Sequence, residues 1–139
     1  MQVHIKTIHE SSAAVGWTGP RTVVIDRTAR EGGMGIGFSG GELLLMAIGA
    51  SICNNLYHHA AAMDIPLQQL EVIVNGDWAG DPPHAQNIRY DVKLGADAPR
   101  DKIEALLKQA DHHAEVPHTL RSGVAVRLNN YELVKVAVG

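Results

Sequence analysis

Cysteine is almost absent from this sequence: among 139 residues, Cys53 is the only one. A single thiol cannot form a disulfide within the chain, and so low a cysteine content is typical of proteins in a reducing compartment. We therefore expect a cytoplasmic protein whose fold does not depend on disulfides.

The sequence also lacks an excess of charge and a long apolar run. Its 12 basic and 15 acidic residues give a net charge of -3, whereas domains that bind nucleic acid usually have a strongly basic face. The longest apolar segment, residues 43–53, is much shorter than the ~20 residues that cross a bilayer. The N-terminal MQVHIKTIHE has no apolar centre of the kind found in signal peptides. We expect a single domain, residues 1–139, that uses neither nucleic acid nor a membrane as a partner.

Aromatic residues make up only 4% of the chain, so its core must consist mainly of aliphatic side chains. Histidine is frequent by comparison, with eight residues. Five of them form two groups: His58 with His59, and His112 and His113 with His118.

The first forty residues predict short strands and a loop. Strands are expected within residues 3–10, at 13–17 and at 21–26, where β-branched and apolar residues alternate with polar ones. The following segment REGGMGIGFSGG is too rich in glycine for a regular element. It predicts a flexible loop.

Residues 41–63 predict one long helix, with Leu44, Ile48, Ile52 and Leu56 at four-residue spacing. The helix is apolar on nearly every face as far as Asn54, which predicts burial on most sides. In so small a domain, a second subunit is the natural source of that burial.

The second half of the chain predicts strands at 70–78 and 87–95, an amphipathic helix at 98–113 and a short helical turn within 117–123. Two last strands are expected at 124–128 and 131–138, around a turn at Asn129 and Asn130. Mostly hairpin-linked strands interrupted by helices indicate an α+β fold class.

The segment VVIDRTAREGGMGIGFSGGELLLMAIGAS resembles a motif of the OsmC/Ohr superfamily of osmotically inducible and organic hydroperoxide resistance proteins. In that motif a strand ends in Asp, a Gly-rich loop follows, and Glu-Leu-Leu-Leu-x-Ala-(Leu/Ile)-Gly-Ala-Cys opens a helix. The strand ends here at Asp26 and the helical motif starts at Glu42. A second match follows the amphipathic helix, where the family has Cys-Pro and this chain has Val116 and Pro117. The order of elements matches over almost the whole chain.

The resemblance implies a fold and a chemistry. The fold has two antiparallel-rich sheets around central helices and forms an intertwined homodimer with active sites at the interface. In the chemistry, a thiolate on the first helix attacks a hydroperoxide and becomes a sulfenic acid, which a second cysteine resolves to a disulfide. An arginine and a glutamate hold the first cysteine as the thiolate. This reaction implies no cofactor.

The two cysteine positions of the family carry no cysteine in this chain. Counting from Glu42, the reactive position is Ser51 and the resolving position is Val116. Cys53 lies two residues further along the helix, a rotation of about 200°, so it points to nearly the opposite side. Cys53 therefore has two interpretations, a relocated reactive thiol or a small apolar core residue.

Several residues are candidates for the carboxylate and guanidinium groups that would activate a thiol. Glu42 is the candidate carboxylate, although a carboxylate in a first helical turn also stabilises the helix N-terminus. Arg21 is the first candidate arginine, and Arg27 and Arg30 are alternatives.

A pocket is expected beside the reactive position. Ser51, Asn55 and His58 recur at i, i+4 and i+7 and so share one helix face. We expect this stripe, with Val116 and Pro117, to line a dimer-interface pocket for a small hydrophobic or peroxide ligand. The histidines His58, His112, His113 and His118 are an alternative metal-ligand set. No H-E-x-x-H spacing supports that set, so no metal is expected.

Three functions are compatible with these residues. The chain is a thiol-dependent hydroperoxide reductase of the stress response that uses Cys53, a degenerate member that binds a ligand without reducing it, or a hydrolytic or metal-dependent enzyme at Ser51, Asn55 and His58. The missing thiols favour the second function over the first. Whether the protein is an enzyme stays open at this point.

Overall fold

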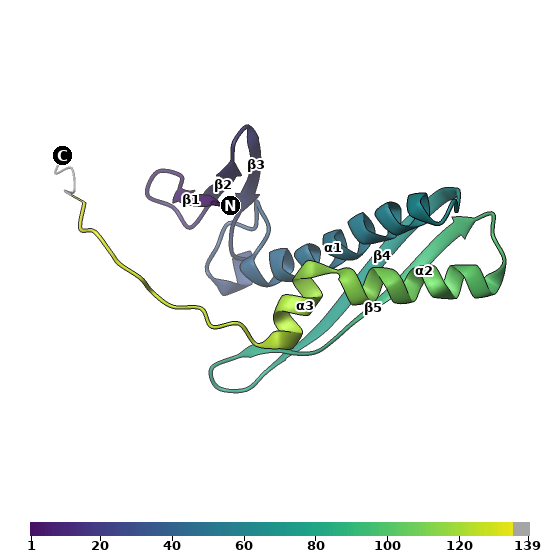
Figure 1. Cartoon of the computed structure of the whole chain (residues 1–139). Coiled ribbons are helices and arrows are strands. Elements are labelled where there is room, and N and C mark those ends of the chain that lie inside the picture. The colour runs from purple at the N-terminus through teal and green to yellow at the C-terminus, as the bar shows by residue number, and fades with distance from the viewer. Residues whose placement is uncertain (135–139) are drawn as a thin grey trace.

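The computed structural model describes residues 1–134, which form two antiparallel sheets, three α-helices and one 3-10 turn (Figure 1). The elements in chain order are β1 (His4–Thr7), β2 (Ala14–Thr18), β3 (Arg21–Ile25), η1 (Ala29–Glu31), α1 (Gly40–Ala62), β4 (Leu67–Ala79), β5 (His84–Ala96), α2 (Arg100–His113) and α3 (Glu115–Ser122). The α+β prediction is confirmed. No helix among the described residues is both long enough and apolar enough to cross a membrane.

The N-terminal sheet has the order β1-β2-β3, and it is joined to α1 by the glycine-rich loop. Asp26, which is 2% exposed, holds this loop. Its carboxylate accepts hydrogen bonds from the Ser12 hydroxyl at 2.8 Å and from the backbone N–H groups of Arg27, Met34 and Ile36. Burial opposes ionisation, but these four hydrogen bonds together lower the pKa of Asp26 below its ordinary value. A buried carboxylate thus takes the place of regular structure in ordering the loop.

The start of α1 is fixed by a capping box. The Ser39 hydroxyl accepts a hydrogen bond from the Glu42 N–H at 3.2 Å, and the Glu42 carboxylate accepts one from the Ser39 N–H at 2.9 Å. The helix runs from Gly40 to Ala62, within one residue of the predicted ends.

The main core lies where α1, α2 and the β4–β5 hairpin meet (Figure 1). Its buried residues are Ile52, Leu56, Ala60, Ile65, Leu106, Ala110 and Ala114. A Cβ atom at Gly49 would lie only 3.2 Å from Cγ2 of Val74. Glycine therefore allows α1 to approach β4 closely at this position.

The β4–β5 hairpin is longer than the predicted strands at 70–78 and 87–95. Trp78 pairs with Ala85 and Ala79 pairs with His84, so the ladder continues almost to the turn. Of the segment AGDPPHAQ between the two predicted strands, only residues 80–83 lie outside the hairpin strands.

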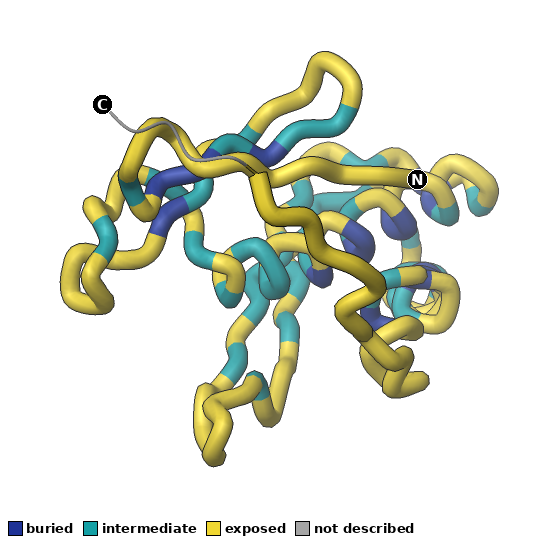
Figure 2. The backbone as a smooth tube through the Cα atoms, turned by 90° about the vertical axis from the view of Figure 1, so that its left-hand side faces the viewer, coloured by how far each residue is buried: buried dark blue, intermediate teal, exposed yellow. Residues whose placement is uncertain are grey.

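Within one chain, α1 is buried on a single side, whereas the sequence predicted burial on most sides. Its buried residues form one stripe: Ile48, Ser51, Ile52, Asn55, Leu56 and Ala60. Elsewhere on the helix Met46 is 49% exposed and Tyr57 is 57% exposed. Figure 2 shows that the buried residues form short stretches separated by intermediate and exposed ones.

The predicted strand at 124–128 is wrong, as is the described part of the strand predicted at 131–138. Residues 124–134 form no regular element and lead away from the helices (Figure 1). A strand needs a neighbouring edge with which to exchange backbone hydrogen bonds, and this segment has none within the described chain. Residues 135–138 of the last predicted strand lie outside the described residues.

Candidate functional site

Ser51 and Val116, which stand at the two cysteine positions of the resemblance, lie next to each other. Ser51 is on the buried stripe of α1 and Val116 is in the first turn of α3. The Val116 N–H donates a hydrogen bond to Ser51 Oγ at 3.3 Å. The fold therefore brings together two positions that are 65 residues apart in the sequence.

Glu115 completes a polar network at this contact. Its Oε2 accepts a hydrogen bond from Asn55 Nδ2 at 3.2 Å and one from Ser51 Oγ at 3.4 Å. Asn55 also donates to the Ser51 carbonyl oxygen at 2.9 Å. The sequence alone gives Glu115 no role in this contact, and its position directly before Val116 and Pro117 is the only signal.

The ionisation of Glu115 limits what the network can do chemically. The Glu115 backbone N–H and then the Asn55 amide stabilise the charged form, and both lower the pKa of the Glu115 carboxyl, as do Ser51 and His113. A carboxylate with a low pKa is a weak general base for a serine hydroxyl. Ser51 therefore has a hydrogen-bond partner but no strong base to activate it.

Cys53 lies on another side of α1, as the rotation of about 200° between positions 51 and 53 predicts. It is partly exposed and lines a groove of about 320 Å³ between α1 and β4. The other lining residues are Leu45, Met46, Gly49, Ala50, Val72 and Val74. None of them is charged, so the groove offers the thiol no cationic partner.

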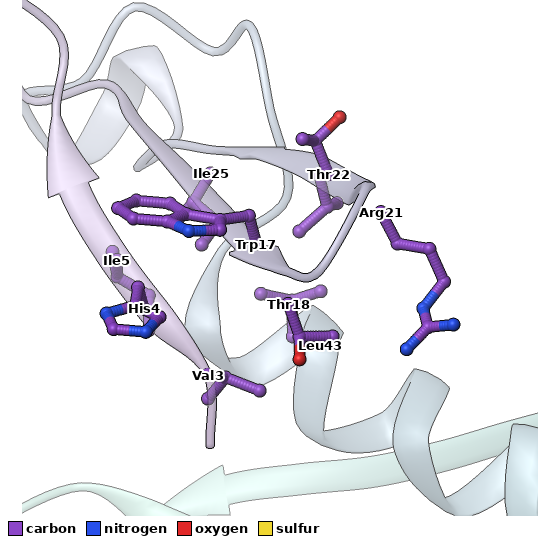
Figure 3. A pocket seen from close by; sticks show the side chains of 11 residues that line it. Val3, His4, Ile5, Trp17, Thr18, Arg21, Thr22, Ile25 and Leu43 are labelled. Carbon is purple, nitrogen blue, oxygen red and sulfur yellow. The ribbon is translucent and has the colours of Figure 1, made fainter. Parts of the chain in front are cut away.

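Glu42 and Arg21 lie in other parts of the structure. Glu42 closes the capping box of α1. Arg21 follows the β2–β3 turn and lines an apolar groove of about 320 Å³ together with Trp17 and Leu43 (Figure 3). Within residues 1–134, no hydrogen bond or ion pair joins either residue to Ser51 or Cys53.

Within the single chain, Ser51, Asn55 and His58 do not line a common pocket, and the predicted pocket at a dimer interface stays a prediction. Ser51 and Asn55 are buried, and their polar atoms bond to each other and to Glu115. His58 is exposed, whereas Glu115 and Val116 at the start of α3 bond to Ser51 and Asn55.

A smaller crevice of about 110 Å³ lies beside the network. Ile48 and Pro117, the neighbours of Ser51 and Val116, form part of its wall, and the remaining lining residues are Ile88, Tyr90, Leu120 and Arg121. At its rim the Tyr90 hydroxyl donates to Asp111 at 2.6 Å, and Arg121 donates to the same carboxylate oxygen at 2.9 Å. Burial, and then the bond to Asp111, raise the pKa of Tyr90.

The four histidines of the alternative metal-ligand set do not come together around one point in the described structure. His58, His112 and His113 belong to a row of rings that also includes His59, and His118 makes no ring contact with it in the described structure. Within residues 1–134, no group of three or more metal-ligating side chains is placed to hold an ion.

Comparison with known proteins places the chain in a family. The model of the OsmC-like protein family matches residues 32–129, which contain α1, the β4–β5 hairpin, α2 and α3. The chain belongs to the OsmC-like family. No curated protein matches the sequence.

Solved OsmC-like structures are similar to this one in fold at low sequence identity. The OsmC-like protein from Mycoplasma pneumoniae has a TM-score of 0.77 at 14% identity, over 88% of this chain and 87% of its own. The organic hydroperoxide resistance protein OsmC from Legionella pneumophila has a TM-score of 0.60 at 16% identity, over 87% and 90%. An OsmC-like hydroperoxide resistance protein from Jannaschia sp. has a TM-score of 0.57 at 14% identity, over 91% and 87%. At such identities the likeness shows the OsmC-like fold alone.

Proposed function

We propose that this OsmC-like chain is a stress-response protein that binds a small apolar ligand, such as an organic hydroperoxide or its alcohol, without reducing it. The observation that carries the proposal is the contact between Ser51 Oγ and the Val116 N–H at 3.3 Å. The two positions that hold the reactive and resolving thiols of the family are adjacent, yet neither carries sulfur.

Hydroperoxide reduction by a thiol needs a thiolate that becomes a sulfenic acid, and a serine hydroxyl has no corresponding reaction. Cys53 is the only sulfhydryl in the chain. It lies in a groove of uncharged residues, away from Ser51 and Glu115. A reaction at Cys53 would also lack an internal thiol to resolve the product.

A hydrolytic function at Ser51 is less well supported. A serine nucleophile needs a base within hydrogen-bond reach, and the side chains that bond to the Ser51 network are an amide and an ionised carboxylate. His58 is exposed and is not part of that network.

The crevice beside Pro117 suits an apolar ligand with one polar end. Ile48, Ile88, Pro117 and Leu120 offer apolar contacts, while Tyr90 and Arg121 offer polar groups at the rim. The volume of about 110 Å³ is small, and we propose that a second copy of the chain encloses it further. This homodimer is also supported by the partly exposed apolar side of α1 and by the apolar side chains of residues 124–134.

The binding of tert-butyl hydroperoxide and of tert-butanol tests this proposal. Both should bind to the full chain with a Kd on the order of 1 mM, because such small ligands make few contacts. Leu120→Trp, which fills the crevice, should abolish both binding events in NMR titrations. Val24→Trp is the matched control: Val24 has a similar exposure, 41% against 43% for Leu120, but lies on β3. Unchanged binding in Leu120→Trp, or no binding in the wild type, would refute the proposed site.

A further inference from the structure

Four histidine rings form a continuous row across the junction of α1 and α2. The ring centroids are 5.1 Å apart for His58 and His59, 4.8 Å for His59 and His113, and 4.9 Å for His113 and His112. His58 and His59 stand near the C-terminal end of α1, and the other two are the last residues of α2. We call these four residues the histidine row.

The rings of the row differ in their surroundings. His59 is partly buried, whereas His58, His112 and His113 are exposed. The His113 Nδ1 lies 2.9 Å from the Gln109 carbonyl oxygen, which can only accept, so Nδ1 carries a proton and donates. One side of the row is therefore anchored to the backbone of α2.

The two ends of the row differ in the charged groups beside them. Asp111 interacts with His112, and Glu115 interacts with His113. The titratable groups that act on His59, by contrast, are His113 from α2 and His58 from its own helix, and no described carboxylate of β4 does so. Burial first, then the charges of His113 and His58, lower the pKa of His59.

We propose that the histidine row is an acid-sensitive latch between α1 and the junction of α2 with α3. Neutral rings pack against one another, while protonated rings about 5 Å apart repel across the two helices. Glu115 and Val116 follow His113 after only one further residue. Opening the row therefore loosens the hydrogen bonds that hold Val116 and Glu115 to Ser51. This inference does not depend on which ligand the site binds.

The direction of the pH effect follows from the lowered pKa of His59. The open state takes up a proton more readily than the closed state, so closure is favoured at high pH and lost as the pH falls below about 6.5, the ordinary value of histidine. The pKa of Glu115 lies below its ordinary value of 4.5. The Glu115 carboxylate therefore stays ionised between about pH 5 and 6.5, and a change in that interval belongs to the histidines.

Hydrogen exchange at the Val116 amide tests the latch, because this N–H is bonded to Ser51 Oγ. After correction for intrinsic exchange, protection of this amide should fall several-fold between pH 7.5 and pH 5.3 in the wild type. His59→Gln should remove this pH dependence. His118→Gln, which changes an exposed histidine of α3 outside the row, should behave as the wild type. Equal protection at both pH values, or wild-type behaviour of His59→Gln, would overturn the proposal.

A second variant covers the case in which His59→Gln does not fold. His113 is exposed, so His113→Gln should fold while removing the neighbouring charge from His59. The His59 ring should then titrate at a higher pH than in the wild type, as followed by the NMR signals of its carbon-bound protons. A His59 titration unchanged by His113→Gln would show that the rings are not coupled.

Discussion

Replacing both Ser51 and Val116 with cysteine should give a chain that forms an internal disulfide when it meets an organic hydroperoxide. The Ser51 side chain already reaches to within 3.3 Å of the Val116 backbone nitrogen. Sulfur atoms introduced at positions 51 and 116 would therefore lie close enough for a disulfide to form after a small movement. The thiolate introduced at position 51 would attack the peroxide, release the alcohol and become a sulfenic acid. The thiol at position 116 would then displace water and form the disulfide. Thiol counting should show a fall from three free thiols to one per chain.

Single variants separate the two steps of that reaction. Ser51→Cys alone should form a sulfenic acid that a dimedone probe traps, but no internal disulfide, and Val116→Cys alone should form neither. The disulfide should persist when Cys53→Ser is added to the double variant. A double variant that keeps three free thiols, or whose disulfide includes Cys53, would show that positions 51 and 116 are not paired as described.

Substituting both Val126 and Leu128 with aspartate should convert the proposed homodimer into monomers of much lower stability. Val126 is 97% exposed and Leu128 is 82% exposed in the single chain, although both belong to a segment with strand-like alternation. Burying each of them against a second copy would contribute about 1.5–3 kcal/mol, and a charge in the same place opposes burial. Sedimentation velocity should show the loss of the dimer, and thermal unfolding should lose its dependence on protein concentration.

The neighbouring positions provide the matched control. Ala125→Asp with Arg127→Asp introduces two carboxylates on the alternate side of the same segment, and this variant should remain dimeric. A wild-type chain that sediments at low concentration as a stable folded monomer would contradict the dimer.

The elements that the sequence predicted well are those whose residue pattern lies within one continuous segment. The four-residue spacing along α1 and the alternation in β4 and β5 each describe one segment packed on one face. Ser39 and Glu42, three residues apart, fix the start of α1 by hydrogen bonds within a single turn.

The final strands failed because alternation shows which side chains are apolar but not which strand edge lies beside them. Residues 124–134 carry a strand-like pattern, and the described chain supplies no partner for it. To predict that residues 124–134 form a strand, one must know which other strand has a free edge beside them. The sequence of the segment does not contain that information.

The site was only partly predictable for a similar reason. The adjacency of Ser51 and Val116 depended on the family resemblance, since nothing local links residues so far apart. His58 was expected on the buried stripe because it follows Ser51 by seven residues, and that spacing is correct for the helix face. His58 is nevertheless exposed in the structure, because helical spacing carries no information about how much of a helix face its neighbours cover. The contacts of Glu115 with Asn55 and of His59 with His113 were not predicted, because each joins two elements that are distant in the sequence.

The consumption of an organic hydroperoxide in the presence of a dithiol reductant tests the central claim most directly. Wild-type protein and Cys53→Ser should both consume cumene hydroperoxide at the rate of the reductant alone, because the family positions carry Ser51 and Val116. The double variant with cysteine at positions 51 and 116 is the positive control, and it should turn over in the same assay. Rapid consumption by the wild type that Cys53→Ser abolishes would contradict the account and show that Cys53 is the reactive thiol.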